Sequence, residues 1–149
     1  AQTVKGVFIG AQLHDIGKIS IPLEILSKPG RLNDVEMAMI RIHSTVGHDI
    51  LKGIEFQWPI HQMVLQHHER IDASGYPEGI GGDEILLEAR IISIADVVEA
   101  ISSHRPYRPA LGIEVAVKEI KANIGRYYDK NAAECCLALI KEGFTFESV

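Results

Sequence analysis

Histidine and aspartate side chains that can bind divalent metals recur along this chain of 149 residues. Two of them are adjacent, in the segment His14-Asp15-Ile16-Gly17-Lys18. An imidazole and a carboxylate can hold a metal together, and Lys18, about one helical turn later, can hold an anion. The candidate ligands are His14, Asp15, His43, His67, His68 and Asp96. Nitrogen and oxygen ligands without a thiolate favour iron, manganese or another hydrolytic metal over a structural zinc site.

The candidate ligands lie where a helix should present apolar residues. His43 follows Met39 by four residues and precedes Val46 by three, and Asp96 follows Ile92 by four. Such spacings put each polar residue on a helix face with apolar neighbours. An unpaired carboxylate in a core costs several kcal/mol unless it meets a cation. A single buried histidine is more often an ordinary core residue, so the prediction of a shared multinuclear metal site depends on the combination.

Three cations are candidates for binding an anionic substrate. Lys18 follows the first ligand pair, and Arg105 and Arg108 flank Pro106-Tyr107, beyond the segment that carries Asp96. A guanidinium group suits bidentate capture of phosphate, although most such charges on a protein are solvated. Because all three follow ligand-bearing segments, we expect them to contact phosphate. The remaining histidines lack such support and are expected to be surface or core residues: His48, His61 and His104.

Apolar periodicity predicts helices along almost the whole chain. The expected helices cover residues 4–14, 33–50, 59–68, 83–104, 113–124 and 130–141, and a glycine-rich loop covers 72–82. Asn33 and Glu36 have the spacing of a capping box at the start of the second helix. The apolar face expected for that helix consists of Val35, Met39, Ile42, Val46 and Ile50. The pattern predicts an all-α protein without an internal domain boundary.

Composition excludes several classes of protein. A net charge of −5 argues against a general nucleic-acid binder, so neither DNA nor RNA polymers are expected as partners. No apolar run approaches the roughly 20 residues of a membrane helix, so we expect no membrane contact within this chain. The adjacent Cys135 and Cys136 are expected to serve packing, and nothing suggests an oxidising compartment. The expected location is the cytoplasm.

Short motifs run through the chain around the candidate ligands and cations. They are His14-Asp15-Ile16-Gly17-Lys18, His43 with Gly47 and Ile50-Leu51, His67-His68-Glu69-Arg70, Gly75-Tyr76-Pro77, Ala89-Arg90-Ile91, Ala95-Asp96 and Arg105-Pro106-Tyr107-Arg108. In this order and with this spacing they resemble the HD-GYP family, a branch of the HD phosphohydrolase superfamily. The resemblance spans nearly the whole chain.

The resemblance implies an HD-domain helical bundle that hydrolyses cyclic di-GMP to the linear dinucleotide pGpG, to GMP or to both. By motif position, the resemblance implies that all six candidates bind metal and that together they hold two or three ions of iron or manganese. It makes Lys18, Arg105 and Arg108 phosphate contacts, and it places Tyr76 on the substrate side of the site. We expect Asp15 to bridge two metals, which lower the pKa of water and so supply a nucleophile at neutral pH.

Family members carry a further histidine, and sometimes a glutamate, on a helix upstream of the His-Asp pair. No such residue precedes His14, so we expect residues 1–149 to form an HD-GYP domain without its N-terminal helix or helices. The resemblance also implies a parent protein with a sensory or receiver domain and a GGDEF-protein partner. The chain's own Gly81-Gly82-Asp83-Glu84 is similar to a diguanylate cyclase signature but lacks the flanking strands.

Two alternative functions remain open at this point. A non-catalytic module would bind cyclic di-GMP or a partner protein and only transmit a signal. An HD phosphohydrolase of another branch would act on ordinary nucleotides. Product analysis with manganese or ferrous iron distinguishes the non-catalytic module, which would bind cyclic di-GMP without cleaving it. A panel of nucleoside mono- and triphosphates distinguishes the second alternative, which would prefer them to cyclic di-GMP.

Overall fold

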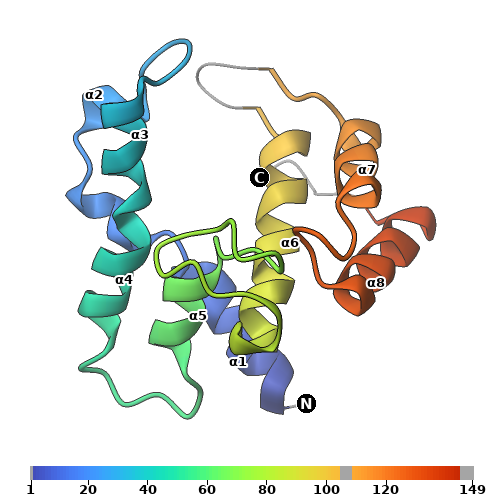
Figure 1. Cartoon of the computed structure of the whole chain (residues 1–149), viewed down its shortest axis with the longest axis horizontal. Helices are drawn as coiled ribbons and strands as arrows, with labels where there is room; N and C mark the ends of the chain where they lie inside the picture. The colour runs from blue at the N-terminus through green and yellow to red at the C-terminus, as the bar shows by residue number, and fades with distance from the viewer. Residues whose placement is uncertain (1, 105–108, 145–149) are drawn as a thin grey trace.

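The computed structural model describes residues 2–104 and 109–144. Within these ranges the chain is helical and forms no β-strand, which confirms the all-α prediction (Figure 1). The elements are α1 (Gln2–Leu13), η1 (Ile16–Ser20), α2 (Leu23–Leu26), α3 (Asp34–Arg41), α4 (His43–Leu51), α5 (Ile60–Gln66), η2 (Gly82–Glu84), α6 (Leu87–Ser102), α7 (Ile113–Ala122) and α8 (Lys130–Lys141). None of the described helices is long and apolar enough to cross a membrane.

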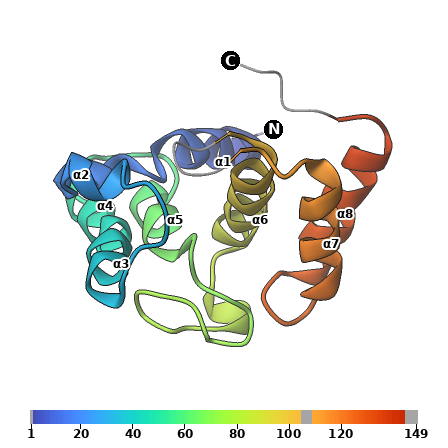
Figure 2. The ribbon, with the colours of Figure 1, turned by 90° about the horizontal axis from the view of Figure 1, so that it is seen from above.

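Helix α6 lies between two apolar clusters. Figure 2 shows it between α1 and α5 on one side and α7 and α8 on the other. Ile92 packs into the first cluster with Met63 and Val64 of α5, while Ile94 and Val98 pack into the second. Because both sides of α6 are buried, the helix has little freedom to shift, and Asp96 is held at a fixed place between the clusters.

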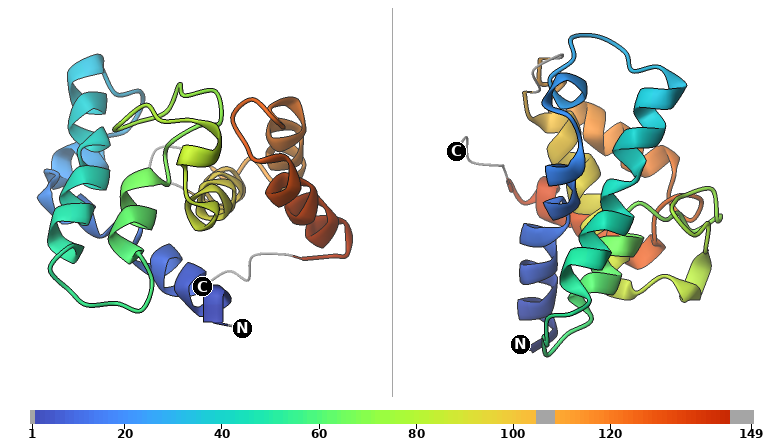
Figure 3. Two further views of the ribbon diagram at one scale, coloured as in Figure 1. Left: turned by 60° about the horizontal axis from the view of Figure 1, so that its bottom comes forward. Right: turned by 90° about the vertical axis from the view of Figure 1, so that its left-hand side faces the viewer.

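The segment after α1 crosses α4 at very short range. A Cβ atom on Gly17 would lie 1.9 Å from the carbonyl oxygen of His43 and 2.6 Å from the backbone nitrogen of Gly47. Only glycine allows this approach. It brings the His14-Asp15 pair against the start of α4, as the right-hand view of Figure 3 indicates for the two segments.

The predicted helix over residues 33–50 is divided into α3 and α4 at Ile42. The capping box is confirmed: the Asn33 side chain accepts from the Glu36 amide, and the Glu36 carboxylate accepts from the Asn33 amide, both at 2.9 Å. The division falls beside the carbonyl of Ile40, which accepts hydrogen bonds from the His43 ring and from the Ile42 amide.

The predicted apolar face of this segment is wrong at three positions. Val35, Ile42 and Ile50 are exposed. The buried face of α4 consists instead of His43, Ser44, Gly47 and Leu51. Small residues there let η1 approach the helix, so close backbone packing rather than apolar volume determines which side faces inward.

Two predicted helix ends are also corrected. Helix α5 ends at Gln66, so His67 and His68 follow the helix rather than lie in it. The helix predicted from Asp83 begins at Leu87. Ile85 has extended backbone and a buried side chain, and it pulls the chain into the core before the helix can start. The predicted break at 105–108 lies outside the described residues.

The two cysteines lie on α8 beside an apolar cavity of about 450 Å³ between α6 and α8. Cys136 packs against the second cluster, and burial raises the pKa of its thiol. Cys135 is exposed. Both thiols are free, and the predicted packing role fits Cys136 but not the exposed Cys135.

Replacing Gly17 with alanine should destabilise the fold, because backbone atoms leave no space for the added methyl group. We expect the free energy of unfolding to fall by about 3 kcal/mol or more, at the upper end for overpacking. Gly53→Ala is the control, since a Cβ there meets nothing within 4 Å. Denaturant unfolding measures both variants, and equal stability would contradict the close approach.

Candidate metal centre

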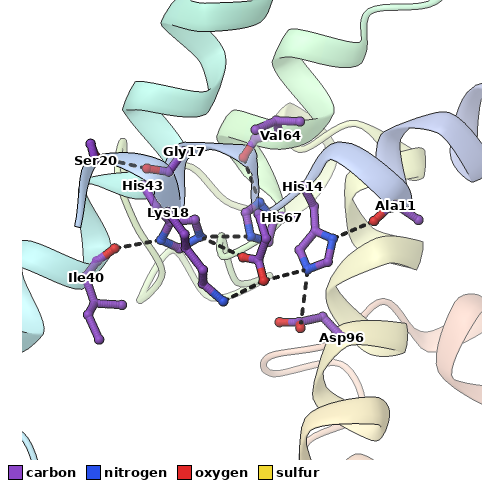
Figure 4. A network of polar contacts seen from close by, with 11 residues as sticks. Ala11, His14, Gly17, Lys18, Ser20, Ile40, His43, Val64, His67 and Asp96 are labelled. Carbon is purple, nitrogen blue, oxygen red and sulfur yellow. Dashed lines mark hydrogen bonds and ion pairs between the residues drawn. The ribbon is translucent and has the colours of Figure 1, made fainter. Parts of the chain in front are cut away.

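Three imidazoles are fixed in the same way. In each, the Nδ1 atom lies against the main-chain carbonyl oxygen of the residue three positions earlier (Figure 4). The pairs are His14 with Ala11 at 2.5 Å, His43 with Ile40 at 2.6 Å and His67 with Val64 at 2.6 Å. A carbonyl oxygen can only accept, so Nδ1 carries the proton. In a neutral ring, Nε2 then presents a lone pair, which is the form that binds metals.

The accepting carbonyl groups all lie in the last turns of helices, those of α1, α3 and α5. Carbonyl groups in a last turn have no partner within their own helix, so they are free to accept from a histidine that follows. The same helix ends carry a partial negative charge, which favours a cation nearby. The local fold thus orients the imidazoles and favours positive charge at one place.

The Nε2 atoms converge. Those of His43 and His67 are 3.3 Å apart, and His43, His67 and His68 offer ligand atoms that all lie within 4.8 Å of one another. His43 and His67 are almost fully buried. Two lone pairs that face each other at this distance repel unless a cation or a proton lies between them. The arrangement therefore fits a bound metal ion better than an empty core.

The remaining candidate ligands complete the cluster. One carboxylate oxygen of Asp15 lies 3.4 Å from Nε2 of His14, and the other lies 3.5 Å from Nε2 of His43. Nε2 of His14 is also 3.6 Å from a carboxylate oxygen of Asp96. The structure thus brings all six sequence-predicted ligands together, from the end of α1, the start of α4, the end of α5 and the middle of α6.

Burial sets the charge of these groups. It lowers the pKa of His67 to about 4 and also lowers the pKa of His43 and His68, so these imidazoles are neutral at pH 7. Burial would raise the pKa of Asp96, but its contact with His14 outweighs burial and lowers the pKa. Burial would likewise lower the pKa of His14, but its contacts with Asp96 and Asp15 outweigh burial and raise it. Neutral imidazoles beside an ionised carboxylate are the protonation states that metal binding requires.

Lys18 and Tyr76 lie at the edge of this cluster. The Lys18 ammonium group is 2.5 Å from Asp15 and is about one-third exposed, so an anion can reach it. The Tyr76 ring stacks on His68, with centroids 4.8 Å apart and an interplanar angle of 26°. Arg105 and Arg108 lie outside the described residues.

Sequence reasoning missed Arg41. Its guanidinium carbon lies 5.1 Å from the centroid of the Tyr76 ring, which is a cation–π distance. The available signal was a cation two positions before His43, within the same predicted helix. His48 and His61 form a separate pair, with ring centroids 5.3 Å apart.

The fold agrees with comparisons to known proteins. The HD domain family matches residues 2–132, and the chain belongs to this family. The chain is 39% identical over 138 residues to the cyclic di-GMP phosphodiesterase response regulator RpfG of Xanthomonas campestris pv. campestris. It is 41% identical over 143 residues to a cyclic di-GMP phosphodiesterase of Thermotoga maritima. A further relative is the 3′3′-cGAMP-specific phosphodiesterase 3 of Vibrio cholerae, at 40% over 131 residues.

These matches cover 91%, 93% and 88% of the chain, in the same order, but only 36%, 38% and 28% of the relatives. The chain therefore spans between about a quarter and two-fifths of their length. A crystal structure of a cyclic GMP-AMP-specific phosphodiesterase from V. cholerae matches 93% of the chain and 38% of that protein, with a TM-score of 0.66 and 19% identity. This likeness establishes the fold, and the family resemblance inferred from the motifs is confirmed.

Replacing His67 with glutamine should weaken Mn²⁺ binding by more than about 100-fold. Loss of a group that only hydrogen-bonds to a metal ligand already lowers metal affinity by about 10–100-fold, and His67 is itself a proposed ligand. His48→Gln is the matched control, since that imidazole lies outside the cluster. Calorimetric titration of the metal-free protein measures both. Wild-type Mn²⁺ affinity in a folded His67→Gln protein would contradict the site.

Proposed function

We propose that this domain is a metal-dependent phosphodiesterase that hydrolyses cyclic di-GMP to pGpG, to GMP or to both. The observation that carries the proposal is the convergence of six nitrogen- and oxygen-bearing side chains on one place, with three imidazoles each oriented by a bond from Nδ1 to a main-chain carbonyl oxygen. The substrate class comes from relatives in three bacteria, which are named as phosphodiesterases for cyclic di-GMP or for 3′3′-cGAMP.

In this proposal His14, Asp15, His43, His67, His68 and Asp96 hold two or three divalent ions, iron or manganese. When bound, such ions neutralise phosphate charge and make water acidic enough to attack at neutral pH. Asp15 acts as a bridging ligand because its two oxygens face different imidazoles, those of His14 and His43.

Substrate contacts are assigned to side chains around this centre. Lys18, beside Asp15, neutralises a phosphate oxygen and stabilises the charge that develops on it during attack. Arg105 and Arg108 are proposed as further phosphate contacts. Tyr76, stacked on His68, forms a wall of the substrate site. Burial raises the pKa of its hydroxyl group, which therefore remains protonated and able to donate at neutral pH.

The proposal extends to the cellular setting. Residues 1–149 are proposed as one HD-GYP domain that works in the cytoplasm of a bacterium, where its substrate acts as a messenger. One relative is named a response regulator, which supports a parent protein with a receiver or other sensory domain. A GGDEF protein, as the source of the substrate, remains the proposed partner.

Asp15→Ala should lower kcat for cyclic di-GMP by about 10³-fold or more, because it removes both bridging oxygens. Asp49→Ala provides the control, since that exposed carboxylate of α4 pairs with Lys52 and His48 away from the cluster. Chromatography of the products in Mn²⁺ or anaerobic Fe²⁺ measures turnover. Full activity of metal-loaded Asp15→Ala protein would refute the assigned role.

Lys18→Met should lower kcat/KM by about 10²-fold, the loss expected for one group that stabilises developing charge. Lys52→Met removes an exposed lysine outside the cluster and should have no effect. Metal content of both variants should equal that of the wild type. An unchanged kcat/KM for Lys18→Met would remove Lys18 from the substrate contacts.

A substrate panel separates the proposal from the alternatives. We expect cyclic di-GMP to be cleaved with a higher kcat/KM than 3′3′-cGAMP and than nucleoside mono- and triphosphates. Preference for 3′3′-cGAMP would keep the reaction and change the substrate, whereas preference for ordinary nucleotides would overturn the assignment. Tight binding of cyclic di-GMP without cleavage, in protein shown to contain metal, would favour a signalling module.

A further inference from the structure

Glu69 is a charged residue that is almost completely buried. It directly follows His68, and 2% of its surface is exposed. One carboxylate oxygen, Oε1, accepts hydrogen bonds from the backbone amides of Glu78 at 2.7 Å and Gly79 at 3.2 Å. A carboxylate that accepts from two amides is a strong anchor, because charge-assisted bonds exceed neutral ones in strength. These amides belong to the glycine-rich loop and lie two and three residues after Tyr76.

The same loop is held on the other side of Tyr76. The amide of Tyr76 donates to the carbonyl oxygen of His68 at 3.3 Å. A Cβ on Gly75 would lie 2.4 Å from the Cα of Glu69, so only glycine lets the loop lie directly on this backbone. Contacts before and after Tyr76 therefore converge on the His68-Glu69 segment.

Tyr76 lies between these two attachments. Its ring stacks on His68, and the Arg41 guanidinium lies over it. A loop residue keeps such a position only if the backbone on both sides is fixed. The Gly75 contact fixes one side, and the bonds to Glu69 fix the other.

We propose that Glu69 is a positioning residue that holds Tyr76 at the substrate side of the metal centre, and is not a metal ligand. Its Oε1 atom accepts from the loop amides, and its Oε2 atom is buried without a hydrogen-bond partner among the described residues, so neither oxygen is hydrogen-bonded to a candidate metal ligand. The inference rests on the proposed function, because it assumes that Tyr76 contacts the cyclic dinucleotide.

Two substitutions distinguish positioning from ligation. Glu69→Gln keeps an oxygen that can accept from the two amides, whereas Glu69→Ala removes it. We expect Glu69→Ala to raise KM for cyclic di-GMP by about tenfold or more with a smaller effect on kcat, and Glu69→Gln to remain within about threefold of the wild type. Mn²⁺ content should be unchanged in both. Glu84→Ala, which removes an exposed carboxylate of η2, is the control.

A double-mutant cycle tests whether Glu69 acts through Tyr76. The double variant Glu69→Ala/Tyr76→Ala should have the same KM for cyclic di-GMP as Tyr76→Ala alone. Once the Tyr76 ring is absent, the loss of Glu69 can no longer change its position. Additive losses would overturn the inference. So would a Glu69→Gln protein that is as impaired as Glu69→Ala and has lost Mn²⁺, since that result would make the carboxylate a ligand.

Hydrogen exchange supplies a readout that does not depend on activity. The amides of Glu78 and Gly79 should exchange faster in Glu69→Ala than in the wild type, and at nearly the wild-type rate in Glu69→Gln. Unchanged exchange in Glu69→Ala would overturn the inference whatever the substrate is. Absence of cyclic di-GMP turnover by the wild type would instead overturn the proposed function.

Discussion

The hydrogen bond from an imidazole Nδ1 to a carbonyl oxygen at a helix end is the interaction on which this site depends. It occurs at His14, His43 and His67, each time with the residue three positions earlier. The bond satisfies a carbonyl group that the helix leaves without a partner, and it determines which ring nitrogen remains free. Because secondary structure itself supplies the acceptor, no separate set of carboxylates is needed to orient these rings.

The rest of the fold keeps the three helix ends together. The backbone contact at Gly17 brings the His14-Asp15 pair against α4. Met63, Val64 and Ile92 join α5 to α6 and so bring His67 close to Asp96. The first apolar cluster therefore stabilises the protein and also brings ligands from distant parts of the chain to one centre.

Sequence alone identified the chemistry of this centre better than its geometry. Residue type and spacing singled out the six side chains that the fold brings together, and the capping box marked the start of α3. The inward face of α4 was wrong because periodicity weighs apolar volume. That face depends instead on Ser44 and Gly47, whose small size lets η1 approach from a segment about 27 residues away.

Long-range contacts also explain what the sequence did not reveal about the rim of the site. Arg41 meets Tyr76 through space, across some 35 residues, so no local pattern could assign it. Glu69 belonged to a recognised motif, but its hydrogen-bond partners are backbone amides. Every residue except proline has such an amide, so residue type does not reveal which amides a side chain will bind. Side chains that act on backbone are the hardest to identify without coordinates.

Helix α1 has a mechanical consequence, because it ends one residue before the first two ligands. Its outer face exposes Val4 and Phe8, while Gly6 and Gly10 pack closely on Trp58 and Met63. A rod of 12 residues is about 18 Å long, so a tilt of about 5° displaces its far end by about 1.5 Å. Coordination distances tolerate only about 0.2 Å. A contact on the outer surface of α1 that tilted the helix by this amount would therefore move His14 and Asp15 by more than metal coordination tolerates.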